Sequence, residues 1–297
     1  MTGMDLEQTQ IDPAQAAQQR ARVAAVFDRV ADTYDRVGVP WFEPIAEALV
    51  AEVAPAPGER ALDIGTGRGA ALWPLALGVG PTGRVTGLDL SVRMVEETRR
   101  EAAERGLTNV DVVTADAAAP GLPAASVDVL VASLVLFFLP DPGAALRAWH
   151  GVLAPGGRLG VSTFGPRAAT WVELDDVFTP YLPPQLLDAR TSGERGPFAS
   201  DAGVEHLLTS AGLTDVRTTH RQQLLTFPDV EHWRRWTWSH GQRAHWDAVP
   251  QERHADVLAA AADRLEAARD ATGGLALTQD VRLTVGRRPP TVTSSPD

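Results

Sequence analysis

The chain has 297 residues, of which 44% are hydrophobic, so it can bury a full core, and we expect one decorated α/β domain. Its formal net charge of −11 disfavours nucleic acids and anionic membranes as partners, because their phosphates would be repelled. The absence of cysteine excludes disulfides, thiolate metal sites and thiol nucleophiles, and it fits the cytoplasm as the expected location.

The first 57 residues predict an N-terminal helical segment. Residues 1–19 are polar and match neither a signal peptide nor a membrane span. Between residues 14 and 37, apolar side chains recur at steps of three and four, which indicates an amphipathic helix. Pro40 interrupts this pattern, and a second helix is predicted at residues 42–53. The apolar positions of the first helix are Val23, Val26, Phe27, Val30 and Tyr34.

Residues 58–164 alternate between apolar runs and amphipathic segments, and we interpret them as the core that binds a cofactor. The apolar runs predict strands at residues 61–64, 84–90, 110–114, 127–136 and 158–163. The segments between them predict helices at residues 70–77, 91–105 and 142–153. This alternation is typical of a doubly wound parallel sheet with right-handed crossovers.

Residues 165–286 are less regular. A Pro- and Gly-rich stretch at 164–200 precedes a helix at 201–211, a strand at 215–227, a helical block at 230–271 and a strand at 276–285. Ligands of doubly wound sheets bind beyond the carboxyl ends of the strands, so these insertions are interpreted as a substrate cap around the last strands. Residues 287–297 are rich in Pro, Thr and Ser and predict a disordered tail.

A glycine-rich loop, Asp63-Ile64-Gly65-Thr66-Gly67-Arg68-Gly69, follows the first strand of the core. Glycines permit a sharp turn and a close approach of the backbone to a ligand. The spacing also fits the dinucleotide fingerprint, so a nicotinamide cofactor is one alternative and a glycine loop without a ligand is another. Asp63 could accept from a ligand's ammonium group or hold the loop through backbone N–H groups.

Two more aspartates follow the second and third strands. Asp89 stands where two carboxylate oxygens could accept from both hydroxyls of a ribose. The alternative for Asp89 is a carboxylate favoured by the dipole of the next helix. Asp116 could accept from an exocyclic amine such as that of adenine, or it could be a solvated loop residue.

In their order and spacing, these residues resemble the class I S-adenosyl-L-methionine (SAM)-dependent methyltransferases, especially the small-molecule branch of quinone-biosynthesis and bacterial natural-product enzymes. The resemblance covers about residues 21–164. It implies a seven-stranded, mostly parallel Rossmann-like α/β sheet with an N-terminal helical lid and helical cap insertions. It also implies SAM as the cofactor and S-adenosyl-L-homocysteine as its product. The matching motifs lie at residues 26–35, 62–69, 87–94, 116–117, 133–141 and 153–157.

The same resemblance implies roles for individual residues. The backbone from Gly65 to Gly69 would face the methionine part of SAM, and Asp89 would hold the ribose hydroxyls. Leu90 and Met94 would flank the adenine, and Asp116 would bond its amine. The cofactor-binding residues expected from the resemblance are Tyr34, Asp63, Gly65, Gly67, Asp89, Leu90, Met94, Asp116, Ala117 and Ser133.

The sequence departs from the family after the fourth strand. Many relatives carry a histidine pair or a polar residue there, whereas this chain has an apolar run at residues 136–139. Such an apolar wall would suit a hydrophobic acceptor, so Phe137 and Phe138 are expected to contact it, with helix–sheet packing as the alternative. Phe27 is expected to contact the acceptor and Tyr34 to close the lid, with packing within the helix as the alternative.

The segment at residues 233–246 holds four of the eight tryptophans, which could line a ring-shaped acceptor or dock a helix on the sheet. Trp238 is therefore an expected acceptor contact. Methyl transfer from a sulfonium needs alignment and dehydration but no nucleophile on the protein. A hydroxyl acceptor would need a base, for which His240 is the candidate. No metal is predicted, because Asp175 and Asp176 have no evident partners.

The sequence thus predicts a SAM-dependent methyltransferase that acts at O, C or N of a small, largely apolar or aromatic acceptor, as in natural-product biosynthesis. Two alternatives remain open, a nicotinamide-dependent oxidoreductase and a SAM-binding protein without methyl transfer. Use of SAM for a rearrangement is a related alternative. The expected partner is the small-molecule acceptor, and a homodimer is left open.

Overall fold

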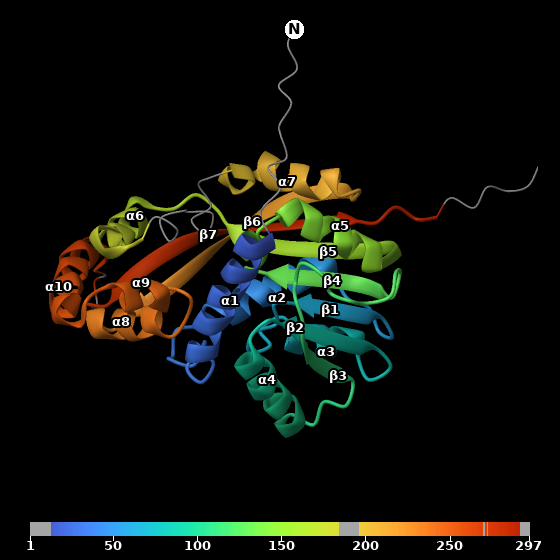
Figure 1. Cartoon of the computed structure of the whole chain (residues 1–297), viewed down its shortest axis with the longest axis horizontal. Helices are drawn as coiled ribbons and strands as arrows, with labels where there is room; N and C mark the ends of the chain where they lie inside the picture. The colour runs from blue at the N-terminus through green and yellow to red at the C-terminus, as the bar shows by residue number, and fades with distance from the viewer. Residues whose placement is uncertain (1–12, 184–195, 270, 272, 292–297) are drawn as a thin grey trace, which may run out of the picture.

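The computed structural model describes residues 13–183, 196–269, 271 and 273–291. Its centre is a seven-stranded sheet in the order β3-β2-β1-β4-β5-β7-β6 (Figure 1). Neighbouring strands from β1 to β5 pair parallel, and β7 pairs antiparallel with β5 and β6. The predicted Rossmann-like fold class is therefore confirmed. The strands are β1 (Arg60–Ile64), β2 (Arg84–Asp89), β3 (Val110–Thr114), β4 (Val127–Ser133), β5 (Leu153–Phe164), β6 (Thr214–Phe227) and β7 (Leu275–Arg287).

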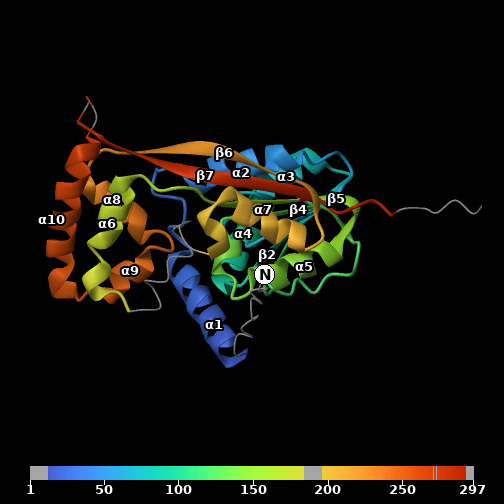
Figure 2. The same ribbon diagram turned by 90° about the horizontal axis from the view of Figure 1, so that it is seen from above.

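Helices cover both faces of the sheet (Figure 2), with α2 and α3 on one face and α5 and α7 on the other. α2 lies close to β5, because a Cβ at Gly160 would be only 2.7 Å from Val53 Cγ1. The predicted cap at Ser91 is present, since its hydroxyl accepts from the Met94 N–H. The flanking helices are α2 (Phe42–Val53), α3 (Leu72–Val79), α4 (Val92–Glu104), α5 (Pro142–Val152) and α7 (Asp201–Ser210).

The first helix, α1 (Pro13–Val30), ends seven residues before the predicted end at residue 37. The N–H groups of Thr33 and Tyr34 both donate to the Val30 carbonyl, and the chain then turns through Asp35, whose φ is +55°. The apolar spacing continued past the helix because Tyr34 still packs against Phe27, with ring centroids 6.0 Å apart. The buried side chains therefore keep a helical spacing in the sequence after the helix itself has ended.

The apolar run after β4 also misled the prediction. β4 ends at Ser133 rather than at residue 136, because Leu134 has a φ of +57° and a short 3-10 helix, η1 (Leu136–Phe138), follows. Leu136 and Phe137 are buried, so the run stays apolar although the strand has ended. β5 begins earlier than predicted, at Leu153, and a register shift against β4 accommodates the expected turn at residues 154–157.

The long strands β6 and β7 project from the sheet to a group of helices, which we call the cap (Figure 1). One cap helix, α6, lies in the stretch predicted to be irregular, and the predicted helical block divides into three α-helices. The cap helices are α6 (Ala169–Asp176), α8 (Val230–Trp238), α9 (Arg243–Ala248) and α10 (His254–Leu265). Short 3-10 helices are η2 (Thr179–Tyr181), η4 (Gly196–Ala199), η5 (Gln251–Arg253) and η6 (Glu266–Ala268).

The C-terminal strand extends into the segment predicted to be a tail. β7 includes Arg287, and the Arg288 N–H donates to the Gly157 carbonyl at 2.9 Å. The Arg288 guanidinium also donates to the carbonyls of Gly151 and Leu153. Residues 292–297 of that segment lie outside the described residues, as do residues 1–12 and 184–195 of the predicted lid and cap.

Candidate active site

The glycine loop turns at the carboxyl end of β1. Gly65, Gly67 and Gly69 all have positive φ, between 49° and 86°, a region in which other residues are strained. The Thr66 N–H donates to the Leu88 carbonyl at 2.8 Å, which ties the loop to β2. The loop faces a cavity of about 270 Å³. Of the expected cofactor residues, five line this cavity: Tyr34, Asp63, Gly65, Gly67 and Ser133.

Gly65 leaves room for the side chain of Val135, which follows strand β4. A Cβ at residue 65 would lie 2.4 Å from Val135 Cγ2, and φ there is +68°. We expect Gly65→Ala to lower the free energy of unfolding by about 2–4 kcal/mol, from backbone strain and overpacking together. Gly106→Ala is the matched control, because its φ is also +68° and its Cβ would meet open space. Equal losses for both variants in urea unfolding would contradict the clash.

Asp63 is buried beneath the loop, with 1% of its surface exposed. Its Oδ2 accepts from the Thr66 hydroxyl at 2.6 Å, so Asp63 holds the loop through a side chain of the loop. Burial, with a smaller contribution from the charge of Asp89, raises the pKa of Asp63 to about 7. Asp63 also lines the cavity, so both expected roles, loop support and contact with a ligand cation, are open to it.

This raised pKa predicts a pH-dependent stability. In the folded protein Asp63 keeps its proton up to about pH 7, whereas in the unfolded chain it loses the proton near pH 3.8. The stability that protonated Asp63 gives the folded state is therefore lost as pH rises from about 4 to about 7. Burial likewise raises the pKa of Asp35, another cavity residue, to about 6. We expect the ligand-free protein to be less stable at pH 8 than at pH 5, and Asp63→Asn to reduce this difference. Urea unfolding at both pH values measures it, with exposed Asp111→Asn as control; an unchanged difference would contradict the assignment.

Asp89 connects the glycine loop to the start of α4. Its Oδ2 accepts from the Gly67 N–H and its Oδ1 from the Ser91 N–H, both at 2.8 Å. Each carboxylate oxygen retains a lone pair that can accept from a ligand hydroxyl. Burial is the main cause that raises the pKa of Asp89. Burial also raises the pKa of the Tyr34 phenol well above its usual value, and the negative charges of Asp35 and Asp89 add to this effect.

The other expected cofactor residues are not among the residues that line the cavity, and two of them, Met94 and Asp116, contact the lid segment. Met94 is fully buried and packs on Val30 and Ala31 of the lid segment. Asp116 is partly buried, its Oδ2 is 3.4 Å from Arg20 Nε of α1, and its Oδ1 accepts from the Ala118 N–H. Because its side chain is 31% exposed on a loop, the solvated-loop alternative for Asp116 stays open beside the adenine contact. Leu90 is half-buried, and the Ala117 carbonyl accepts from Trp149 Nε1 at 2.7 Å.

The expected acceptor residues Phe27, Phe137 and Phe138 join the cavity in one aromatic surface. Tyr34 and Phe42, which line the cavity, are stacked with ring centroids 4.4 Å apart. Phe27 meets Tyr34 at 6.0 Å and Phe138 at 5.7 Å, both edge to face, and Phe137 lies 4.8 Å from Phe138. We call these five rings the aromatic wall. It continues from the cavity across η1, where the family-typical polar residues are missing.

His240 and Trp238, the two site residues expected from the tryptophan-rich segment, lie in different surroundings. The His240 ring meets Phe42 edge to face at 6.0 Å and Trp236 at 4.4 Å, so it borders the aromatic wall. Burial and the nearby His245 lower the pKa of His240 to about 3. Trp238 instead packs inside the cap, 5.7 Å from Trp246 and under the Arg243 guanidinium.

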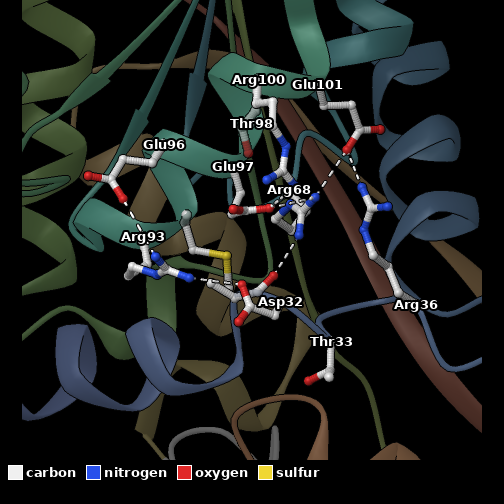
Figure 3. Close-up of polar contacts among 12 residues, drawn as sticks. Asp32, Thr33, Arg36, Arg68, Arg93, Glu96, Glu97, Thr98, Arg100 and Glu101 are labelled. Carbon is white, nitrogen blue, oxygen red and sulfur yellow. Dashed lines mark hydrogen bonds and ion pairs between the residues drawn. The ribbon is translucent and has the colours of Figure 1, made fainter. Parts of the chain in front are cut away.

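A buried arginine of the loop was missed by the sequence interpretation. Arg68 has a side chain that is 6% exposed, and it donates to the Ala31 carbonyl at 2.6 Å. Its guanidinium also lies 3.3 Å from Glu101 and 3.7 Å from Glu97 of α4 (Figure 3). Arg36 of the lid segment pairs with the same Glu101. This network, whose partners lie about thirty residues apart in the sequence, fastens the lid segment to the glycine loop.

The part of the chain that the structure describes also bears on metal binding and membrane insertion. Within it, no three His, Cys, Asp or Glu side chains are placed to hold a metal ion. Asp175 pairs with Arg167 and accepts from Gln242 Nε2 at 3.0 Å. None of the helices in the described ranges is long and apolar enough to cross a membrane.

Comparisons with known proteins agree with this geometry. The family described as "Methyltransferase domain" matches residues 62–161. The chain is 38% identical over 275 residues to nocamycin O-methyltransferase of Saccharothrix syringae, covering 89% of this chain and 98% of that protein. It is 44% identical over 169 residues to aklanonic acid methyltransferase of Streptomyces sp. (strain C5), covering 57% and 77%.

Solved structures support the same fold. Phosphoethanolamine N-methyltransferase 2 of Haemonchus contortus, in complex with S-adenosyl-L-methionine, aligns with a TM-score of 0.56 and 14% identity, over 88% of this chain and 57% of that chain. At this identity the likeness shows the fold alone. These similarities do not favour the alternatives of an oxidoreductase or a protein without transferase activity. The chain therefore belongs to the class I methyltransferase family.

Proposed function

We propose that the protein transfers the methyl group of SAM to an oxygen atom of a small, largely aromatic natural product. The observation that carries this proposal is the continuity between the donor cavity and the aromatic wall. Tyr34 and Phe42 belong to both, so a methyl donor held by the glycine loop would lie beside a flat apolar surface. Such a surface suits a ring-shaped acceptor.

The residues of the cavity fit SAM. Positive-φ glycines leave the loop backbone open to a ligand, and the carboxyls of Asp63, Asp35 and Glu43 line the cavity, where an ammonium or sulfonium needs negative charge. Asp89 retains acceptor capacity for ribose hydroxyls. Leu90, Met94, Asp116 and Ala117 are proposed to form the adenine side, where Arg20 of α1 now contacts Asp116.

When bound, SAM supplies an electrophilic methyl group on a positively charged sulfur. The chain's own contribution is then alignment and exclusion of water. Phe27, Phe137 and Phe138 would hold the acceptor's ring system against the cavity, and the cap would cover its outer side. His240, whose ring meets Phe42 of this wall, is proposed to act on the acceptor oxygen.

Oxygen is proposed as the methylated atom because of the two relatives. One is named as the O-methyltransferase of nocamycin and the other as the methyltransferase of aklanonic acid. The first matches nearly the whole chain, including the cap, which is the part that would contact the acceptor. A cytoplasmic location, the domain boundaries and a homodimer remain predictions, of which the last can be checked by light scattering.

Two measurements test the proposed function. Isothermal titration calorimetry should detect binding of SAM and S-adenosyl-L-homocysteine, while reduced nicotinamide cofactors should give no heat. SAM with a labelled methyl group should then transfer label to members of a panel of polycyclic aromatics that carry hydroxyl or carboxyl groups. Failure to bind either adenosyl ligand, or label appearing on nitrogen or carbon acceptors alone, would overturn the proposal.

A further inference from the structure

A polar cluster lies in the cap, next to the aromatic wall. His240 stands in the link between α8 and α9, His245 stands on α9, and α6 contributes Asp175. Gln242 joins the two parts, because its Nε2 donates to Asp175 Oδ1 at 3.0 Å. His240 meets Phe42 of the wall, so the cluster is one ring away from the donor cavity.

Two nitrogens of this cluster have no hydrogen-bond partner among the described residues and are shielded from solvent. They are His240 Nε2 and His245 Nδ1. Buried polar atoms are nearly always paired, since an unpaired one loses its hydration without compensation. His240 lies between the wall and the cap, where an acceptor would bind by the proposed function. A bound acceptor with a polar group would supply the missing partner.

The tautomer of His240 follows from its other nitrogen. The Gln242 backbone N–H donates to His240 Nδ1 at 3.3 Å, so Nδ1 is the acceptor of the ring. A neutral imidazole has one acceptor and one donor nitrogen, and the proton of His240 therefore lies on Nε2. The unpaired atom is thus an N–H donor and has no lone pair with which to take a proton from a hydroxyl.

The surroundings keep both histidines neutral. His240 is packed between Trp236 and Phe42, and His245 against Phe178, so neither imidazole is solvated well enough to ionise readily. Burial lowers the pKa of His245 as it does that of His240. Asp175, the acidic member of the cluster, is paired with Arg167. A neutral His240 that presents an N–H cannot act as a base, so it suits an acceptor oxygen that has already lost its proton.

We infer, on the premise of the proposed function, that His240 anchors an acceptor whose reacting oxygen is already anionic at neutral pH, either a carboxylate or an ionised enol. The His240 Nε2–H donates to this group and holds it against the aromatic wall. The free oxygen lone pair attacks the methyl carbon, the new C–O bond forms, and the C–S bond breaks with its electron pair leaving on sulfur. An anion and a sulfonium become a neutral ester or ether and a neutral thioether, so no proton is transferred.

The test compares two probes of nearly equal shape, anthraquinone-2-carboxylic acid and its carboxamide, in the presence of S-adenosyl-L-homocysteine. We expect the wild type to bind the acid roughly 10- to 100-fold more tightly than the amide, the range for hydrogen bonds to a charged group. His240→Phe should abolish this preference, and His240→Gln, which keeps a donor near the Nε2 position, should retain part of it. His206→Gln, on exposed α7, is the control.

A second measurement does not depend on folding of the variants. Nitrogen NMR of the wild type, labelled in its seven histidines, should show His240 neutral with the proton on Nε2, both alone and with the acid bound. Equal binding of acid and amide, binding of neither, or a preference that survives in His240→Phe would overturn the inference. So would protonation of His240 by the bound acid. Binding of S-adenosyl-L-homocysteine is measured separately, and its absence would instead overturn the proposed function.

Discussion

Replacing Asp89 by alanine is expected to weaken binding of S-adenosyl-L-homocysteine by about 100-fold or more. The Asp89 carboxylate holds the N–H groups of Gly67 and Ser91 at 2.8 Å, and by the proposed function it also accepts from the ribose hydroxyls. Hydrogen bonds to a charged group contribute about 1.5–3 kcal/mol each, and two lost ribose contacts give this factor. Loosening of the glycine loop would add to the loss.

Calorimetry of the Asp89 variants separates these contributions. Asp89→Asn keeps one acceptor oxygen, so its affinity should fall between those of the wild type and Asp89→Ala. Asp111→Ala, on the neighbouring strand β3, removes an exposed carboxylate that pairs with Arg84 and should leave the affinity unchanged. An Asp89→Ala protein that folds and binds within threefold of the wild type would exclude Asp89 from the donor site.

The order of strands and helices in the core could be predicted from the sequence, because most apolar runs there are buried strands, and even the edge strand β3 buries Val112. The errors arise where apolar side chains stay buried beyond the end of a strand or helix. Leu136 and Phe137 are buried in a 3-10 helix, and they resemble the end of β4. Tyr34 packs on Phe27 after α1 has ended. Apolar periodicity reports which side chains are buried, and it does not report the φ of Leu134 or Asp35 that ends the element.

The donor side of the site follows from local spacing, so Asp63, Gly65 and Gly67 could be placed around one cavity from their motif. The acceptor side depends on contacts between distant segments. His240 borders the aromatic wall only because Phe42, about 200 residues earlier in the chain, stacks on Tyr34. Its tautomer is set by a backbone N–H, which no sequence motif records. Trp238, chosen by composition, packs within the cap instead.

The role of Arg68 has the same origin. A single arginine between two glycines gives no sign of its partners, which are a carbonyl at Ala31 and two carboxylates on α4. Glu97 and Glu101 stand on one face of α4, four residues apart, as a helix requires. Once the fold is formed, one buried cation neutralises part of both and bonds the end of α1 (Figure 3). This makes Arg68 the link between the lid segment and the donor loop.

We therefore expect Arg68→Ala to lower the free energy of unfolding by about 2–4 kcal/mol. The loss of stability should lie in the lower part of the range that is usual for removing one partner of a buried ion pair. The reason is that both carboxylates keep other partners: Arg36 and Arg105 for Glu101, and Arg100 for Glu97. Arg100→Ala is the matched control, since its side chain is 61% exposed and its ion pair should contribute less than about 1 kcal/mol.

Hydrogen exchange should distinguish the loss of a lid contact from a uniform loss of stability. If Arg68 fastens the lid segment, amides of residues 23–35 should exchange faster in Arg68→Ala than in the wild type at equal global stability, which mild urea can match. Exchange in β4, at the centre of the sheet, should then be the same in both proteins. Donor affinity should fall with lid protection, because the Ala31 carbonyl and the loop carrying Gly67 would no longer be held together. Uniform acceleration across the lid and β4 would show that Arg68 stabilises the fold without a particular link to the lid.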